Sequence, residues 1–312
     1  MAELRGSYTV TYTPFTEGGA GIDFAALDKF IDWQIEEGSH GLIALGSIGQ
    51  FLAIDDDERT AIVETYVKKC KGRVPVLVGT MNARTENAVR YSKEAEALGA
   101  QGVMITPPYY YTPTEDEIFE YYHQISEAIS IPIMLYNNPI TTNVDMSAAF
   151  VARLTKAFEN IRYIKEASGT ADRCYEIAQL TDGVMNCFAG GRTYECMLFG
   201  AEGYVSPPGN WAPKQSAIMM DSFAAGDRAT AKWLSDKFTA IGKVSGAGHP
   251  TYGHSCYGRE LIKWSGHDLG DPRSPLGPFS ALGKEGTDRM AQVRPLYDEI
   301  RAFDLAKKAA AQ

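Results

Sequence analysis

The chain has 312 residues, of which 45% are hydrophobic and 22% are charged, a composition typical of a globular protein that can bury a large core. Its net charge of −9, with no basic stripe to offset it, argues against a nucleic acid or an anionic membrane as partner. The N-terminal stretch lacks the apolar core of a signal peptide and no apolar run reaches the length of a membrane span, so we expect a cytoplasmic protein.

Short apolar runs recur along the chain from residue 8 to residue 209. Each is rich in β-branched and aliphatic residues and is bounded by glycine or proline, which is typical of buried strands. The pattern predicts eight strands, within residues 8–15, 41–46, 74–80, 102–108, 131–139, 161–167, 183–190 and 203–209.

Longer amphipathic segments separate these runs and predict helices. Residues 54–72 show the signals well, with acids in the first turn, lysines in the last turn and Gly72 as the stop. The other predicted helices lie at 23–38, 85–100, 114–129, 146–158, 171–183 and 192–201. Eight strand–helix units in a row predict a (β/α)8 barrel, an α/β fold. A doubly wound sheet is the second choice, because no glycine-rich dinucleotide fingerprint follows the first strand.

The sequence changes character after the eighth run. Helical patterns fill residues 216–244, 258–267 and 286–303, and a proline-punctuated loop at 270–283 joins the last two. We therefore expect two parts, the barrel over residues 1–225 and a C-terminal helical extension packed on it over residues 226–312.

Lys165 directly follows a short apolar run, whereas most other lysines of this chain lie in solvent-facing helical patterns. The active site of a (β/α)8 barrel lies at the C-terminal ends of its strands, so this position puts an amine in a partly desolvated mouth. There a lowered pKa would free the amine to attack a carbonyl. The alternative is a structural lysine paired with Glu166 or with a helix C-terminus, but strand alternation points Glu166 to the other face.

Other strand ends offer hydroxyl groups and no metal ligands. Ser47 lies in "GSIGQ", Tyr110 in "TPPYYY" and Tyr136 in "YNNP", and phenols suit proton transfer because they both donate and accept. No strand end carries histidine, and acids at ligand spacing are missing, so we expect no metal. The five cysteines show no CxxC pairing and are expected to be reduced and packed.

Taken in order, these motifs resemble the dihydrodipicolinate synthase/N-acetylneuraminate lyase family of class I aldolases. The matching segments are "GSIGQ", "TPPYYY", "YNNP", "IKEASG", "GAEGYVSPPGN" and the C-terminal "PRSPLGP". Each motif is modest alone, but the set runs in family order from about residue 7 to residue 300.

The resemblance implies a role for each matching residue. Lys165 would form an imine with a 2-oxo acid such as pyruvate, and this covalent imine would replace any other cofactor. Tyr136 would be the acid/base, and Ser47 would relay protons between Tyr136 and Tyr110, which would reach in from a neighbouring subunit. Backbone N–H groups around Ser47 and Ile48 would bind the carboxylate. The family is usually a homotetramer built as a dimer of dimers.

The segments that would contact the rest of the substrate depart from the family. Dihydrodipicolinate synthases carry an arginine shortly after Y-N-x-P, where this chain has Thr141 and Thr142, and a hydroxyl cannot replace a guanidinium fork. Sialic-acid lyases carry an acidic pair after strand 7, where this chain has Arg192, which could bind a distal carboxylate or simply face solvent. The strand-2 motif has Ile48 and Gln50 in place of the commoner threonine and glutamate. Gly190 and Val205, in the strand-7 and strand-8 segments, are also expected to line the substrate site.

These departures favour a lyase, an aldolase or dehydratase, acting on a 2-keto-3-deoxy sugar acid or a related 2-oxo acid. The alternatives are 4-hydroxy-tetrahydrodipicolinate synthesis, deamination of a hydroxypyrroline carboxylate, and a non-catalytic barrel that binds a keto acid. The segment "GHPTYGHSC", with His249, His254 and Cys256, is expected to be a structural loop.

Overall fold

The computed structural model describes residues 3–246 and 255–304. Eight parallel strands close into one barrel in sequence order, with β1 paired to both β2 and β8. The strands are β1 (Gly6–Val10), β2 (Gly41–Ala44), β3 (Val76–Gly79), β4 (Gly102–Ile105), β5 (Ile133–Asn137), β6 (Ile161–Glu166), β7 (Asn186–Ala189) and β8 (Gly203–Ser206). The predicted (β/α)8 barrel is confirmed.

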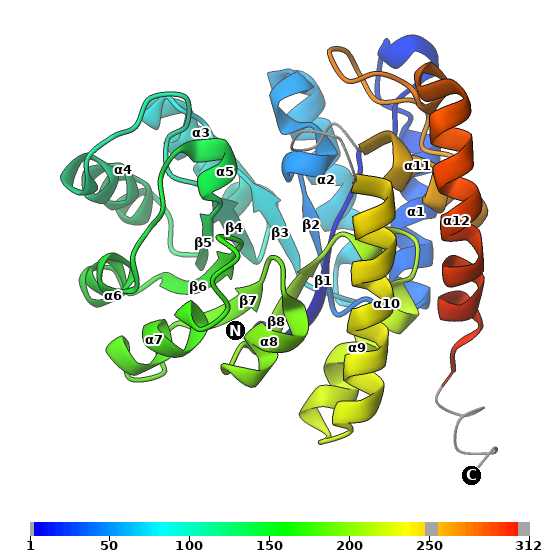
Figure 1. The fold of residues 1–312 in the computed structure, drawn as a ribbon. Coiled ribbons are helices and arrows are strands. Elements are labelled where there is room, and N and C mark those ends of the chain that lie inside the picture. Colours follow the sequence, from blue (N-terminus) through cyan, green and yellow to red (C-terminus); the bar gives the residue numbers. More distant parts are fainter. Residues whose placement is uncertain (1–2, 247–254, 305–312) are drawn as a thin grey trace.

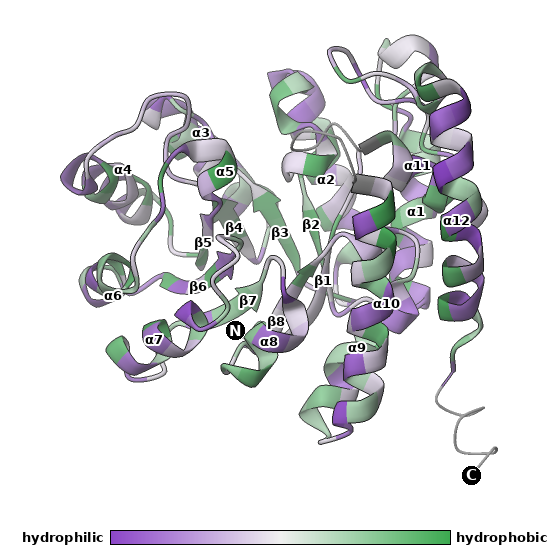
Figure 2. Ribbon diagram, in the orientation of Figure 1, coloured by the Kyte–Doolittle hydropathy of each residue, from purple (hydrophilic) through white to green (hydrophobic). Residues whose placement is uncertain are grey.

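Helices alternate with the strands and surround the barrel (Figure 1). They are α1 (Phe24–Glu36), α2 (Asp56–Cys70), α3 (Thr85–Leu98), α4 (Glu115–Ala128), α5 (Pro139–Thr142), α6 (Ala148–Ala157), α7 (Arg173–Leu180), α8 (Thr193–Leu198) and α9 (Pro213–Ala224). Side-chain caps fix the starts of several; Asp55 and Glu58, for example, form a capping box on α2. The strands are mostly hydrophobic, whereas the outer helices carry both hydrophobic and hydrophilic residues, as expected when both faces of a parallel sheet are covered (Figure 2).

Two features of the strand ends differ from the sequence prediction. The first run, 8–15, forms strand only as far as Val10, and Phe15 leaves the sheet to donate its N–H to Leu269 O at 3.0 Å. Pro14, which has no N–H, cannot extend the ladder there. The short helix α5 was not predicted; Pro139 occupies its first turn and Asn143, at φ 58°, ends it.

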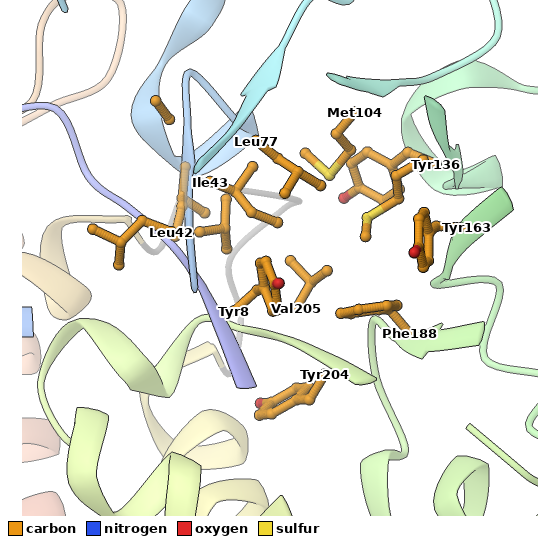
Figure 3. Close-up of a cluster of buried hydrophobic side chains, with 14 of the residues drawn as sticks. Tyr8, Leu42, Ile43, Leu77, Met104, Tyr136, Tyr163, Phe188, Tyr204 and Val205 are labelled. Atoms are coloured by element: carbon orange, nitrogen blue, oxygen red, sulfur yellow. The ribbon is translucent and has the colours of Figure 1, made fainter. Parts of the chain in front are cut away.

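Inside the barrel, large side chains from neighbouring strands fill the interior. Tyr8, Phe188 and Val205 lie around a common centre, with Tyr136 and Met104 on the far side of it (Figure 3). The rings of Tyr8 and Phe188 meet edge to face with centroids 5.4 Å apart. Each such buried side chain contributes about 1.5–3 kcal/mol of hydrophobic stabilisation, so the barrel is a packed core and not a pore.

The C-terminal part consists of α10 (Arg228–Gly246), α11 (Ser255–Trp264) and α12 (Gly283–Ala302), which lie together on one side of the barrel (Figure 1). Helix α10 packs on α9 and α12, and Tyr297 of α12 meets Trp211, just after β8, with ring centroids 5.5 Å apart. A boundary between barrel and extension at residue 225 stays our proposal. Among the described helices, none combines the length and apolarity that a membrane span requires.

Candidate active site

Lys165 and Tyr136 lie side by side inside the barrel. They occupy paired positions of the neighbouring strands β6 and β5, and the Lys165 Nζ lies 3.7 Å from the centre of the Tyr136 ring. Both side chains are buried, with residue exposures of 6% and 2%. An amine over an aromatic face in a desolvated site is held by a cation–π attraction when it is protonated. The structure therefore brings together the two residues that were expected at the centre of the site.

Glu166 does not share this environment. Its carboxylate accepts hydrogen bonds from Asn137 Nδ2 at 3.0 Å and from the Ser168 N–H at 2.6 Å. Asn137 Nδ2 also donates to Asp145, which pairs with Arg173. Burial by itself would raise the pKa of Asp145, but the bonds from Arg173 and Asn137 outweigh it and lower that pKa. Glu166 is thus held by partners of its own outside the barrel interior.

The Tyr136 phenol has a neighbour that the sequence did not single out. Asn138 Nδ2 donates a hydrogen bond to Tyr136 Oη at 3.0 Å. Asn138 is itself buried at the entry of α5, where its carbonyl accepts from the hydroxyls of Thr141 and Thr142 at 3.3 and 3.0 Å. In the sequence, Asn138 was marked only by its position within "YNNP". Whether its amide reaches the phenol of Tyr136, two residues earlier, depends on how the chain turns after β5, and the sequence does not show that turn.

The strand-2 motif forms a tight turn. Ser47–Gly49 is a single 3-10 turn, closed by the Gly49 N–H on Gly46 O and the Gln50 N–H on Ser47 O. The N–H groups at the start of such a turn are not used by the turn itself. Ser47 is half-buried and Ile48 is buried, so the backbone donors expected near them face a partly desolvated region.

A cavity of about 390 Å³ opens at the C-terminal end of the barrel. Within the described chain no charged side chain lines it; its lining is Ser47, Gln50, Phe51, Leu52, Ala53, Thr106, Tyr109, Thr141, Thr142, Ser274, Pro275 and Leu276. The Thr106 hydroxyl is buried and has no hydrogen-bond partner in the described residues. The structure thus brings Ser47 and Thr141 to one hollow, beside a hydroxyl that a ligand could satisfy.

Tyr110 is turned away from its own barrel. It is 82% exposed, and its ring meets that of Tyr111, which is 77% exposed, edge to face with centroids 5.3 Å apart. Its backbone has φ 78°, a conformation that is unfavourable for a residue with a side chain and that often marks functional loops. Within one chain, Tyr110 is therefore displayed on the surface rather than placed at the site.

Gly190 directly follows β7, and Val205 lies within β8. The Gly190 N–H donates to Glu166 O at 2.7 Å, and a Cβ at this position would come within 2.6 Å of the Ala167 Cβ. Only glycine therefore allows the ends of β6 and β7 to approach this closely. Val205 is fully buried and projects into the interior beside Tyr8 (Figure 3).

Arg192 lies apart from the cavity that Ser47 and Thr141 line. Its side chain is 56% exposed, donates to Gly169 O at 3.2 Å and lies 3.7 Å from the Glu195 carboxylate. It borders a second hollow of about 270 Å³, together with Tyr204 and residues of α10. The solvent-facing alternative described above fits these contacts.

No group of three or more possible metal ligands occurs in residues 3–246 and 255–304. All five cysteines are free and buried, as expected from the sequence, Cys256 among them. His249 and His254, the two histidines of the predicted structural loop, lie outside the described residues.

Known proteins are similar to this chain in sequence and in fold. The model of the dihydrodipicolinate synthetase family matches residues 3–293. A 4-hydroxy-tetrahydrodipicolinate synthase of Sorangium cellulosum is 37% identical over 231 residues, covering 73% of this chain and 77% of that protein.

Solved structures agree with these matches. The 4-hydroxy-tetrahydrodipicolinate synthase of Methylacidiphilum fumariolicum SolV is 26% identical, with a TM-score of 0.87 over 96% of this chain and 98% of its own. A prophage protein of the dihydrodipicolinic acid synthase family from E. coli K12, solved in complex with pyruvate, is also 26% identical, with a TM-score of 0.86 over 97% of this chain and all of its own.

Proposed function

The chain belongs to the dihydrodipicolinate synthetase family, and from this premise we propose that it is a class I lyase in which Lys165 forms an imine with a 2-oxo acid of the pyruvate type. The observation that carries the proposal is the Lys165 Nζ, 3.7 Å from the centre of the Tyr136 ring inside a closed barrel. A buried amine beside a phenol combines a nucleophile with a group that can move protons.

The proposed reaction begins when Lys165 Nζ attacks the C2 carbonyl of the 2-oxo acid and the carbonyl oxygen leaves as water. The imine then accepts electrons: when the C3–C4 bond breaks, its electron pair forms an enamine, and the C4 hydroxyl loses its proton as the aldehyde departs. Tyr136 carries this proton, with Asn138 orienting the phenol and Ser47 relaying protons outward. A proton adds to C3, and water hydrolyses the imine to release pyruvate and Lys165.

The carboxylate of the bound acid is assigned to the N–H groups at the start of the Ser47–Gly49 turn, where aligned backbone donors favour an anion. The chemistry needs neither a metal nor a separate cofactor, because the imine itself is the electron sink.

For the rest of the substrate we favour a neutral polyol chain, as in a 2-keto-3-deoxy sugar acid. The mouth cavity has hydroxyls of Ser47, Thr106 and Thr141 and, in the described chain, no charged lining residue. A second carboxylate would be desolvated there without a cationic partner, whereas sugar hydroxyls would find donors and acceptors, including the unpartnered Thr106 hydroxyl.

A second candidate is the condensation of pyruvate with aspartate semialdehyde, the reaction of a 4-hydroxy-tetrahydrodipicolinate synthase. The names of the relatives favour it. Arg192, which follows β7, is the cation that the sequence suggests for a distal carboxylate, but the hollow it borders is distinct from the one beside Ser47.

We further propose a cytoplasmic homotetramer in which Tyr110 completes the site of a neighbouring subunit. The exposure and the left-handed backbone of Tyr110 support this assignment, since such a display is otherwise unfavourable for an aromatic side chain. Sedimentation velocity of the wild-type chain and of Tyr110→Ala tests the assembly; a wild-type monomer with full activity would exclude it.

Borohydride reduction in the presence of pyruvate tests the imine. We expect a pyruvyl adduct on Lys165 in the wild-type protein and none in Lys165→Ala, with borohydride alone as the blank. Absence of an adduct at saturating pyruvate would contradict the proposed function. A panel of 2-keto-3-deoxy sugar acids, aspartate semialdehyde with pyruvate, and hydroxypyrroline carboxylate then distinguishes the substrate classes.

A further inference from the structure

The turn that follows β2 is flanked on both sides by residues in a left-handed backbone conformation. Leu45 and Gln50 both have φ 56°, although neither is glycine. A Cβ makes this conformation unfavourable, so it persists only where the surroundings hold it. The Ser47–Gly49 turn between them therefore depends on contacts outside itself.

On the C-terminal side, these contacts come from the side chain of Gln50. Its Nε2 donates to Arg273 O at 2.8 Å, and its Oε1 accepts from the Arg273 N–H at 3.1 Å and from Arg259 Nη2 at 3.4 Å. Both arginines belong to the C-terminal part of the chain, more than 200 positions away. Both polar ends of the amide are thus committed to that part.

Arg259 is a buried cation that donates hydrogen bonds to oxygen atoms around the Ser47–Gly49 turn. It is 2% exposed and donates to Leu269 O at 2.8 Å and to Thr13 O at 3.0 Å. Thr13 in turn donates its hydroxyl to Gly49 O at 2.7 Å, at the end of the same turn. No carboxylate forms a salt bridge with Arg259 in the described residues, so the amide oxygen of Gln50 and main-chain carbonyls carry its polar contacts. A charged donor in a dry environment strengthens the bond to Gln50.

Arg273 is anchored just as firmly. Its guanidinium donates to both oxygens of Glu58, each at 2.7 Å, and to Ala53 O at 2.6 Å and Gly19 O at 2.8 Å. Gln50, Ala53 and Glu58 all follow the turn in the chain, so Arg273 holds Gln50 through its backbone and the residues after Gln50 through its side chain.

We propose that Gln50, clamped by Arg259 and Arg273, is a positioning residue: it fixes the Ser47–Gly49 turn so that the N–H groups of Ser47 and Ile48 are aimed at the carboxylate of the bound acid. The C-terminal part of the chain thereby controls substrate affinity without touching the substrate. The inference rests on the proposed function for the identity of that carboxylate, but the placement of the turn can be measured without it.

The test compares variants of Gln50 by imine trapping over a range of pyruvate concentrations. Gln50→Gly removes the clamped amide and also relieves the φ strain, so the variant is expected to fold. We expect the concentration for half-maximal trapping to rise about tenfold, the effect of losing one to two net hydrogen bonds, while trapping at saturation stays near wild type. Gln50→Glu keeps the acceptor for Arg259 and for the Arg273 N–H but loses the donor to Arg273 O, so we expect a smaller rise than in Gln50→Gly.

Arg301→Ala is the matched control. Arg301 also joins the C-terminal part to the barrel, with bonds to Glu37 at 3.0 Å and Gln215 at 3.4 Å, but it does not contact the turn. In Arg301→Ala the pyruvate concentration for half-maximal trapping should equal that of the wild type. An equal rise in Arg301→Ala and Gln50→Gly, or no rise in Gln50→Gly, would overturn the proposal.

Amide hydrogen exchange of residues 46–50 gives a second readout that needs no substrate. Exchange should be faster in Gln50→Gly than in the wild type, Gln50→Glu or Arg301→Ala. If the wild type forms no adduct, the proposed function fails while this comparison still decides the clamp; unchanged exchange in Gln50→Gly refutes the clamp whatever the trapping shows.

Discussion

The Lys165 amine lies over the face of the Tyr136 ring, 3.7 Å from its centre, across one paired position of β5 and β6. Because both residues belong to adjacent strands of a closed barrel, neither can shift without disturbing the hydrogen-bond ladder that fixes the other. Rigid strands hold catalytic groups more exactly in place than loops do. The proposed nucleophile and the proposed proton carrier are therefore positioned before any substrate arrives.

The first prediction concerns the phenol alone. Tyr136→Phe keeps the ring next to Lys165 and removes only the hydroxyl. We expect kcat to fall about 10²–10⁴-fold, the usual contribution of a positioned acid/base, while the free energy of unfolding falls by only about 1 kcal/mol. Steady-state kinetics and chemical denaturation measure the two. A loss of less than about threefold in kcat would remove Tyr136 from the reaction.

The second prediction concerns the amide that orients this phenol. Asn138→Ala removes the bond from Nδ2 to Tyr136 Oη, so kcat should fall about tenfold with KM nearly unchanged. In the Tyr136→Phe background the same change should cost nothing further, because the interaction is already absent. Additive losses in this double-mutant cycle would mean that Asn138 acts independently of Tyr136.

The sequence predicted those parts of the protein that depend on local pattern. The eight βα units and the place of Lys165 at the end of a strand follow from periodicity and chain order, and both agree with the structure. The clamp on Gln50 could not be predicted in this way, because its partners Arg259 and Arg273 are remote in sequence and lie in loops and helices of the extension. Arg192 shows the converse limit: its position after a strand was clear, but the direction of its flexible side chain was not.

A third prediction links pH to the attachment of the C-terminal part. The hydrogen bond from Arg273 is the main cause that lowers the pKa of Glu58 below its ordinary value of 4.5. Since this pKa is lower in the folded than in the unfolded protein, the pair stabilises the fold above pH 4.5, and that stabilisation is lost as the pH falls through the lowered folded value.

The measurement is the difference in Tm between the wild type and Glu58→Gln across this range. Glu58→Gln keeps the shape and much of the capping of α2 but cannot ionise. We expect the wild type to be more stable at pH 6 and the gap to shrink steadily below pH 4.5. A gap that does not depend on pH would show that the charge of Glu58 contributes nothing.

The last prediction concerns substrate choice. Thr141 lines the mouth cavity together with Ser47, and the described lining carries no charge. Thr141→Arg would bring a planar guanidinium into this hollow, where it could bind a carboxylate through two parallel hydrogen bonds. We therefore expect kcat/KM for the condensation of pyruvate with aspartate semialdehyde to rise about tenfold or more, and turnover of a 2-keto-3-deoxy sugar acid to fall. Thr141→Lys adds the same charge without the fork and is the matched control, with a smaller gain expected. Efficient use of aspartate semialdehyde by the wild-type chain would show instead that the missing arginine does not decide the substrate.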